Sequence, residues 1–84
     1  MLYEVRFRDA ARKHFLALDA AARRRIAPVI EKLSADPRPS GAKMLIGVRR
    51  IRVGDYRVLF SVDEDGGLVW IEDVRHRSKA YGGH

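Results

Sequence analysis

The chain has 84 residues, with 17 lysine and arginine residues against 11 acidic ones, a formal net charge of +6 and no cysteine. A hydrophobic fraction of 46% with 33% charged residues predicts one folded domain over residues 1–84 and argues against disorder. The absence of cysteine excludes disulfides, thiolate metal sites and a cysteine nucleophile. The positive charge favours an anionic partner: nucleic acid, a membrane surface or an acidic protein.

The sequence begins with a pattern that favours a strand followed by a helix. Residues 2–8 alternate between two sets of side chains, as in a half-buried strand, and residues 10–18 are expected to form a helix with Asp9 as its N-cap. We find neither a signal peptide nor an apolar run near the roughly 20 residues that a membrane span needs. We therefore expect a cytoplasmic protein that does not contact a membrane.

A second helix is predicted after Asp19, which is a plausible N-cap. Starting at Ile26, apolar residues recur at positions i, i+3, i+4 and i+7, which is the signature of an amphipathic helix. Pro28 lies inside this helix and predicts a kink or a break, because proline removes one backbone hydrogen bond and clashes with the preceding turn. A short loop rich in proline and serine follows over residues 34–41.

From Lys43 onward the pattern changes to strands, with a turn over residues 63–67 before a final strand over residues 68–74. The run over residues 68–71 is continuously apolar, which indicates a strand covered on both faces and places Trp70 in the core. The order β-α-α-β-β-β predicts an α+β fold, in which an antiparallel sheet carries the helical pair on one face.

Two of these strands are predicted to form a hairpin around Gly54-Asp55, because glycine in the first position of a two-residue loop suits a type II′ turn, although a turn one residue longer would break the pairing below. The two-residue turn pairs Arg52 with Arg57. The apolar residues then share one face: Ile51, Val53, Tyr56, Val58 and Phe60. The opposite face carries Arg50, Arg52 and Arg57, while Arg49 points away from it. Like charges opposite each other on a sheet cost up to about 1 kcal/mol, so we expect an anion to bind there.

Two plainer interpretations of the arginines remain open: they form the solvated face of the hairpin, or Arg57 makes a structural ion pair with Asp55 or Glu72. A second basic group near the end of the chain makes anion binding the better interpretation. It comprises Arg75, His76, Arg77 and Lys79, followed by Tyr81.

These features occur in an order that resembles the RelE/ParE superfamily of bacterial toxins along nearly the whole chain. The resemblance rests on these motifs: Tyr3-Glu4-Val5-Arg6-Phe7, a helical pair, Asp36-Pro37-Arg38-Pro39 with Leu45 and Gly47, Gly54-Asp55-Tyr56-Arg57-Val58-Leu59-Phe60, and His76-Arg77 with Tyr81. The resemblance implies a RelE/ParE-like fold and a toxin of a type II toxin-antitoxin system.

The resemblance also implies roles for individual residues. Arg57 and Arg75 match arginines that stabilise charge on the scissile phosphate in RelE-like ribonucleases, and Tyr81 matches a terminal tyrosine that stacks on a base. His76 is the alternative proton-transfer group, because its ordinary pKa lies near neutrality. The residues expected to bind RNA are Arg50, Arg52, Arg77 and Lys79. RelE has lysines near Arg50 and Arg52, and arginine preserves phosphate binding but is a poor proton donor.

The resemblance implies, as the leading function, that of a ribosome-dependent endoribonuclease, which cleaves messenger RNA and inhibits translation without a metal or a cofactor. The alternative is a ParE-like toxin that inhibits DNA gyrase by binding, without catalysis. Either function implies a heteromeric complex with an acidic, RelB-like antitoxin, and the first adds the ribosome and its message as partners. The histidines lack the spacing and the carboxylates of a metal site.

Overall fold

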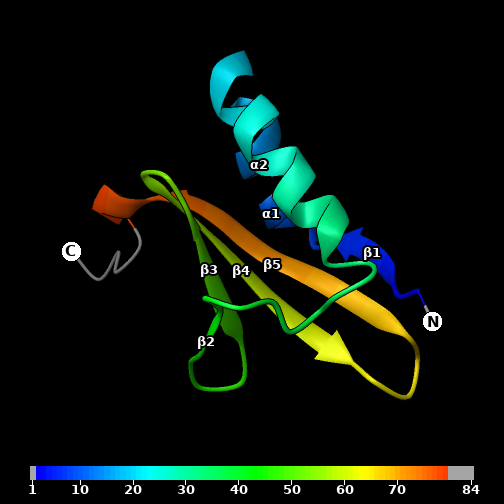
Figure 1. The fold of residues 1–84 in the computed structure, drawn as a ribbon. Coiled ribbons are helices and arrows are strands. Elements are labelled where there is room, and N and C mark those ends of the chain that lie inside the picture. Colours follow the sequence, from blue (N-terminus) through cyan, green and yellow to red (C-terminus); the bar gives the residue numbers. More distant parts are fainter. Residues whose placement is uncertain (1, 80–84) are drawn as a thin grey trace.

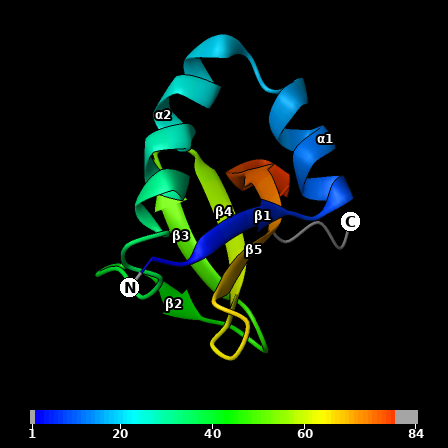
Figure 2. The same cartoon turned by 90° about the vertical axis from the view of Figure 1, so that its right-hand side faces the viewer.

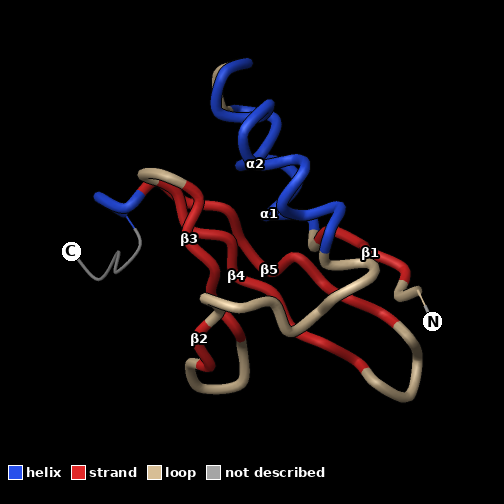
Figure 3. Tube along the Cα trace, viewed as in Figure 1, coloured by secondary structure: helices blue, strands red, loops and turns tan. Residues whose placement is uncertain are grey.

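The computed structural model describes residues 2–79, apart from the side chain of Lys79. The elements, in chain order, are β1 (Glu4–Phe7), α1 (Asp9–Ala17), α2 (Ala20–Lys32), β2 (Lys43–Met44), β3 (Arg49–Val53), β4 (Tyr56–Asp63), β5 (Leu68–His76) and the short 3₁₀ helix η1 (Arg77–Lys79). Two helices therefore precede four strands that follow one another along the sheet (Figures 1 and 3). No helix in this part of the chain is long and apolar enough to cross a membrane.

The strands form one five-stranded sheet in the order β1-β5-β4-β3-β2. The predicted α+β fold is confirmed, with two differences in the sheet. β1 pairs with β5 in parallel, because the chain crosses over through both helices before it returns to the sheet. The two-residue strand β2 was not predicted, and it pairs with β3 only at Arg49 and Arg50.

Both helices cover the same face of the sheet, and the core lies between them and the strands (Figure 2). The buried apolar residues are Ala11, Ala22, Ile26, Ile30 and Leu33 from the helical segment and Val53, Val58, Phe60, Val69, Ile71 and Val74 from the strands. Alternation along β4 sends Val58 and Phe60 into this core, so Arg57 lies on the other face of the sheet. We call this second face, which has no helix over it, the open face.

The helix ends agree with the prediction at Asp19 and differ from it at Asp9. The Asp19 carboxylate accepts a hydrogen bond of 2.8 Å from the Ala22 N–H and caps α2 as expected. Asp9 is the first residue of α1, and Arg8 occupies the cap position without a side-chain hydrogen bond. Helix α1 begins early because a single residue separates it from β1, but a carboxylate in the first turn still favours the helix dipole.

The predicted break at Pro28 does not occur, since α2 runs from Ala20 to Lys32 through that residue. Pro28 and Arg24, one turn before it, are both exposed. Water can therefore reach the Arg24 carbonyl, which loses its partner to proline, and the buried face of the helix keeps its packing.

Candidate functional site: a row of arginines on the open face

The β3–β4 hairpin has the predicted register, with Val53 opposite Tyr56 and Arg52 opposite Arg57. Gly54 has a φ of 60°, and no residue other than glycine has a positive φ within the described part of the chain. A positive φ at the first loop position alone is the pattern of a type II′ turn. The turn chosen by Gly54 therefore fixes which side chains of the hairpin share a face.

The same register continues into β5, where Arg75 lies opposite Arg57. Arg52, Arg57 and Arg75 thus stand abreast on three neighbouring strands of the open face, and we call them the arginine row. Neighbouring strands lie about 4.8 Å apart, so each guanidinium has a like charge close by. Such a row concentrates positive potential where an anion would be held by several donors at once.

Arg57, in the middle of the row, is 8% exposed, although a solvated arginine was one expectation from the sequence. β4 lies inside the sheet, so a neighbouring strand flanks Arg57 on each side. Its Nε is buried and has no hydrogen-bond partner within residues 2–79. A buried donor without a partner costs free energy, which an anionic ligand would relieve.

Arg50 and Arg52 differ in exposure although both belong to β3. Arg50 is 7% exposed and lies between Lys43 of β2 and Leu59 of β4. Arg52 is exposed, because β2 is too short to flank it. Both lie on the open face with Arg57, as predicted, and the register sends Arg49 to the other face.

Arg75 reaches the open face because of an irregularity in the pairing of β4 with β5. Phe60 is opposite Ile71, whereas the preceding residue, Leu59, is opposite Asp73, so Glu72 is an extra residue in β5. A bulge of this kind shifts the alternation of the strand by one position. Val74 can then enter the core, and Arg75 points to the same face as Arg57.

Asp73, which the sequence analysis did not single out, holds Arg75 in place. Asp73 is 7% exposed, and its carboxylate accepts hydrogen bonds from Arg75 Nε, from His14 Nδ1 at 2.6 Å and from the Val74 N–H at 2.8 Å. Burial by itself would raise the pKa of Asp73, but the hydrogen bonds from His14 and Arg75 outweigh it and hold the pKa below its usual value. The signal in the sequence is a pair of acidic residues, Glu72 and Asp73, within a segment that is otherwise apolar from Leu68 to Val74.

The two carboxylates that could have paired with Arg57 bind elsewhere. Glu72 accepts hydrogen bonds from Arg8 at 3.2 and 3.3 Å and from Ser61 Oγ at 2.6 Å. Burial works against ionisation of Glu72, yet these hydrogen bonds lower its pKa below the usual value. Asp55 lies 3.8 Å from Arg77 Nε. Within residues 2–79, the structural ion pair considered for Arg57 is therefore absent.

His76 does not join the arginine row. It lies opposite Tyr56, whose ring it meets edge-on at 5.2 Å between centroids, so it points to the helix-covered side of the sheet. Its Nδ1 is 2.9 Å from Ser78 Oγ. The structure therefore does not bring this predicted proton-transfer group together with Arg57 and Arg75.

The remaining predicted site residues follow β5. Arg77 is exposed, and its N–H donates a 2.6 Å hydrogen bond to the Asp55 carbonyl, which ties η1 to the hairpin turn. Lys79 ends η1. Tyr81 lies outside the described residues. The structure thus places Arg77 beside the turn, one residue beyond the strand that carries Arg75.

Trp70 is not a core residue, contrary to the prediction from the apolar run. It is half-buried and lies opposite Arg6 and Ser61, which puts it on the open face. The Arg8 guanidinium lies 4.0 Å from the centre of its ring and that of Arg6 lies 6.0 Å away. These contacts cover the indole with cations that are themselves paired, Arg8 with Glu72 and Arg6 with Glu4.

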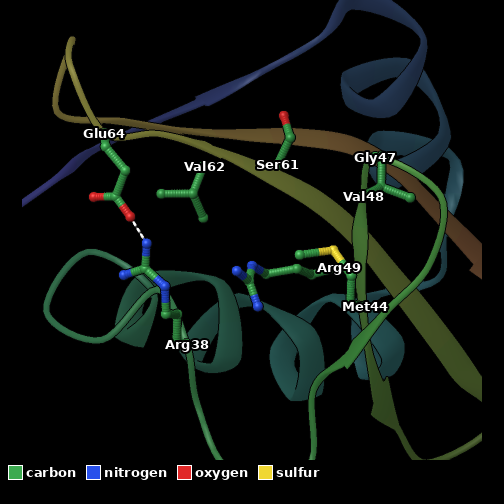
Figure 4. A pocket seen from close by; sticks show the side chains of 8 residues that line it. All are labelled: Arg38, Met44, Gly47, Val48, Arg49, Ser61, Val62 and Glu64. Atoms are coloured by element: carbon green, nitrogen blue, oxygen red, sulfur yellow. Dashed lines mark ion pairs between the residues drawn. The ribbon is translucent and has the colours of Figure 1, made fainter.

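A surface depression lies at the other end of β4 from Arg57 (Figure 4). It is lined by Arg38, Met44, Gly47, Val48, Arg49, Ser61, Val62 and Glu64. Arg38 and Glu64 point toward each other across it and form an ion pair. Of the predicted site residues that the structure describes, none lines this depression, so the candidate site is the arginine row.

Residues 5–81 match the sequence profile of a family described as ParE toxin of type II toxin-antitoxin system, parDE. The chain belongs to this family. It is therefore a toxin of the RelE/ParE superfamily, as the sequence motifs indicated. No curated protein sequence matches it at a significant level.

Solved structures related to this ParE-family toxin include both branches of the superfamily. A chain of the RelBE2 toxin-antitoxin complex from Mycobacterium tuberculosis is 29% identical, with a TM-score of 0.81 over 93% of this chain and 94% of that one. A chain of the RelE-RelB complex from Pyrococcus horikoshii OT3 is 27% identical, with a TM-score of 0.78 over 95% of this chain and 100% of that one. A chain of the ParDE system from P. aeruginosa has the same fold at 15% identity, with a TM-score of 0.71 over 89% of this chain and 96% of that one.

Proposed function

We propose that this toxin is a metal-independent endoribonuclease that cleaves messenger RNA on the ribosome. The observation that carries the proposal is Arg57, a buried arginine whose Nε has no partner among the described residues and which lies between Arg52 and Arg75. A sheet that only needed a soluble face would not bury its central cation between two others. A scissile phosphate, which gains negative charge during cleavage, is a ligand suited to this arrangement.

RNA supplies its own nucleophile for this reaction. The 2′-hydroxyl attacks the adjacent phosphorus, the bond from phosphorus to the 5′-oxygen breaks, and a 2′,3′-cyclic phosphate and a 5′-hydroxyl result. Arg57 and Arg75 would stabilise the charge on the phosphoryl oxygens, and Asp73 holds Arg75 in position for this. Arg50 and Arg52 would bind the backbone, with Arg77 and Lys79 beside them.

The partner expected for this surface is an acidic antitoxin. The related RelE-RelB chains were solved as toxin-antitoxin complexes, and a chain with a formal net charge of +6 favours an acidic protein. An antitoxin carboxylate placed at Arg57 would supply the missing partner of its Nε and exclude RNA. We propose that the toxin and its antitoxin form a heteromeric complex in the cytoplasm.

A second function, inhibition of DNA gyrase by binding, is favoured by the match to the ParE family profile. It agrees with arginine at positions 50 and 52, since arginine binds anions but does not transfer protons near neutral pH. In this case the arginine row would bind gyrase or its DNA, and no chemistry would follow.

One experiment separates the two functions. The chain is induced in translating cells and the 5′ ends of messenger RNA are mapped, while purified protein is tested in a gyrase supercoiling assay. New 5′ ends within coding regions, with unaffected gyrase, are expected, and Arg57→Ala should abolish both the cleavage and the growth inhibition. Inhibited supercoiling with intact message would instead establish the second function.

A further inference from the structure

A histidine from α1 reaches the residue that positions Arg75. His14 Nδ1 lies 2.6 Å from Oδ1 of Asp73, while Oδ2 of the same carboxylate binds Arg75 Nε. The Asp73 carboxylate thus lies between the imidazole and Arg75 of the arginine row. More than half of the His14 side chain is exposed, so a ligand can approach the ring from solvent.

The contact becomes possible where β1 ends. β1 covers the edge of β5 only from Leu68 to Ile71, and α1 then packs against the part of β5 that contains Asp73. His14 is thereby brought to the carboxylate that binds Arg75, although about 60 residues separate His14 from Asp73 in the sequence. No motif in the sequence connects the two.

The hydrogen bond determines how the imidazole can act. Asp73 is ionised at neutral pH, because its hydrogen bonds lower its pKa, and an ionised carboxylate only accepts hydrogen bonds. Nδ1 of His14 must therefore carry a proton, which leaves Nε2 as the basic nitrogen of the neutral ring. The carboxylate also stabilises the imidazolium that forms when Nε2 takes up a proton, as in other histidine–carboxylate pairs.

Among the predicted site residues whose side chains the structure describes, those on the open face are arginines, which are poor proton-transfer groups. His76 lies on the other side of the sheet. Within residues 2–79, the Asp73 carboxylate pairs with the His14 ring, and the Arg75 guanidinium binds the same carboxylate.

We propose that His14, held by Asp73, is the general base of the cleavage reaction. This inference rests on the proposed ribonuclease function. Nε2 of His14 takes the proton of the 2′-hydroxyl while the bond from the 2′-oxygen to phosphorus forms. The bond from phosphorus to the 5′-oxygen breaks, and the leaving oxygen receives a proton from water. The imidazolium then returns its proton to water, so the enzyme is restored.

The test is the single-turnover rate of cleavage of ribosome-bound message between pH 5 and 9. For the native chain we expect a rate that rises with pH to a plateau, as general-base catalysis by an imidazole predicts. His14→Gln should lower the plateau by about a hundredfold or more and remove the rising limb. Lys13→Gln, a neighbouring exposed substitution on α1, should keep the native pH profile.

Chemical rescue and thermal unfolding distinguish the base from a structural clamp between α1 and β5. In His14→Ala, added imidazole should restore a large part of the rate, and the variants should remain folded. If His14→Gln does not fold, His14→Ala with imidazole carries the test. If His14→Gln cleaves at the native rate, the inference is wrong but the proposed function stands. The same holds if the variants cleave slowly with the native pH dependence and His14→Ala does not respond to imidazole. A native chain that cleaves no message overturns the proposed function together with the inference.

Discussion

Replacing Arg57 with methionine should make the protein more stable and remove its toxicity. Methionine keeps an unbranched side chain of similar reach on the open face but carries neither a charge nor an N–H donor. In the native chain, Arg57 faces Arg52 on one side and Arg75 on the other, and its buried Nε has no partner within residues 2–79. The variant removes both like-charge contacts and the buried donor.

The expected gain in the free energy of unfolding follows from these contacts. A like-charged pair directly opposite on a sheet costs about 0.2–1 kcal/mol, and Arg57 takes part in two such pairs. A buried donor without a partner costs about 1–3 kcal/mol more. We therefore expect Arg57→Met to raise the free energy of unfolding by at least about 1 kcal/mol, which raises the Tm of a domain of this size by roughly 4–8 °C.

Thermal unfolding of the purified chain, followed by circular dichroism, measures this difference. Arg52→Met is the matched control, since Arg52 is exposed and has Arg57 as its one cross-strand arginine, so its gain should be smaller. Growth after induction measures toxicity in parallel. A Tm for Arg57→Met below that of the native chain would refute the interpretation of Arg57 as a strained residue kept for binding, and full toxicity of the variant would refute its role in the site.

Four further outcomes are expected. Asp19→Ala should lower the free energy of unfolding by about 1 kcal/mol in a denaturant titration, because α2 loses its N-cap; an unchanged midpoint would contradict this. Because the pKa of Asp73 is lowered in the folded state, its contribution to stability is complete above about pH 4 and is lost as the pH falls through the folded-state pKa. Asp73→Asn should therefore make the free energy of unfolding depend less on pH at acid pH. A dependence as steep as that of the native chain would contradict this. Arg8→Ala should cost about 0.5–1 kcal/mol in unfolding free energy and shift the fluorescence of Trp70, and identical spectra would argue against the stacking. If the Tyr81 hydroxyl, and not water, carries the proton to the leaving oxygen, Tyr81→Phe should slow cleavage of ribosome-bound message by about a hundredfold, whereas a native rate would leave water as the donor.

The sequence by itself determined the hairpin that carries Arg52 and Arg57. A turn of two residues that starts with glycine has one favoured geometry, and that geometry sets the register of the flanking strands. Alternation then distributes the side chains between the two faces. These are local effects, and the α+β arrangement followed from the same periodic patterns.

Where a residue depends on a distant segment, the local pattern gave a wrong or incomplete answer. Trp70 belongs to an apolar run, but its place on the open face depends on pairing with Arg6 and Ser61. Pro28 predicts a break by its local geometry, but the packing of α2 on the sheet keeps the helix continuous.

Only the tertiary structure decided that Arg75 lies on the open face and that His14 meets Asp73. Without the bulge at Glu72, alternation from Ile71 would place Arg75 on the core side of β5. The meeting of His14 with Asp73 depends on β1 ending at Phe7, which leaves room for α1 against the edge of β5. Both features arise from contacts between segments about 10 to 60 residues apart, and the free energy of such contacts is set by the packing of the whole fold, which no local pattern contains.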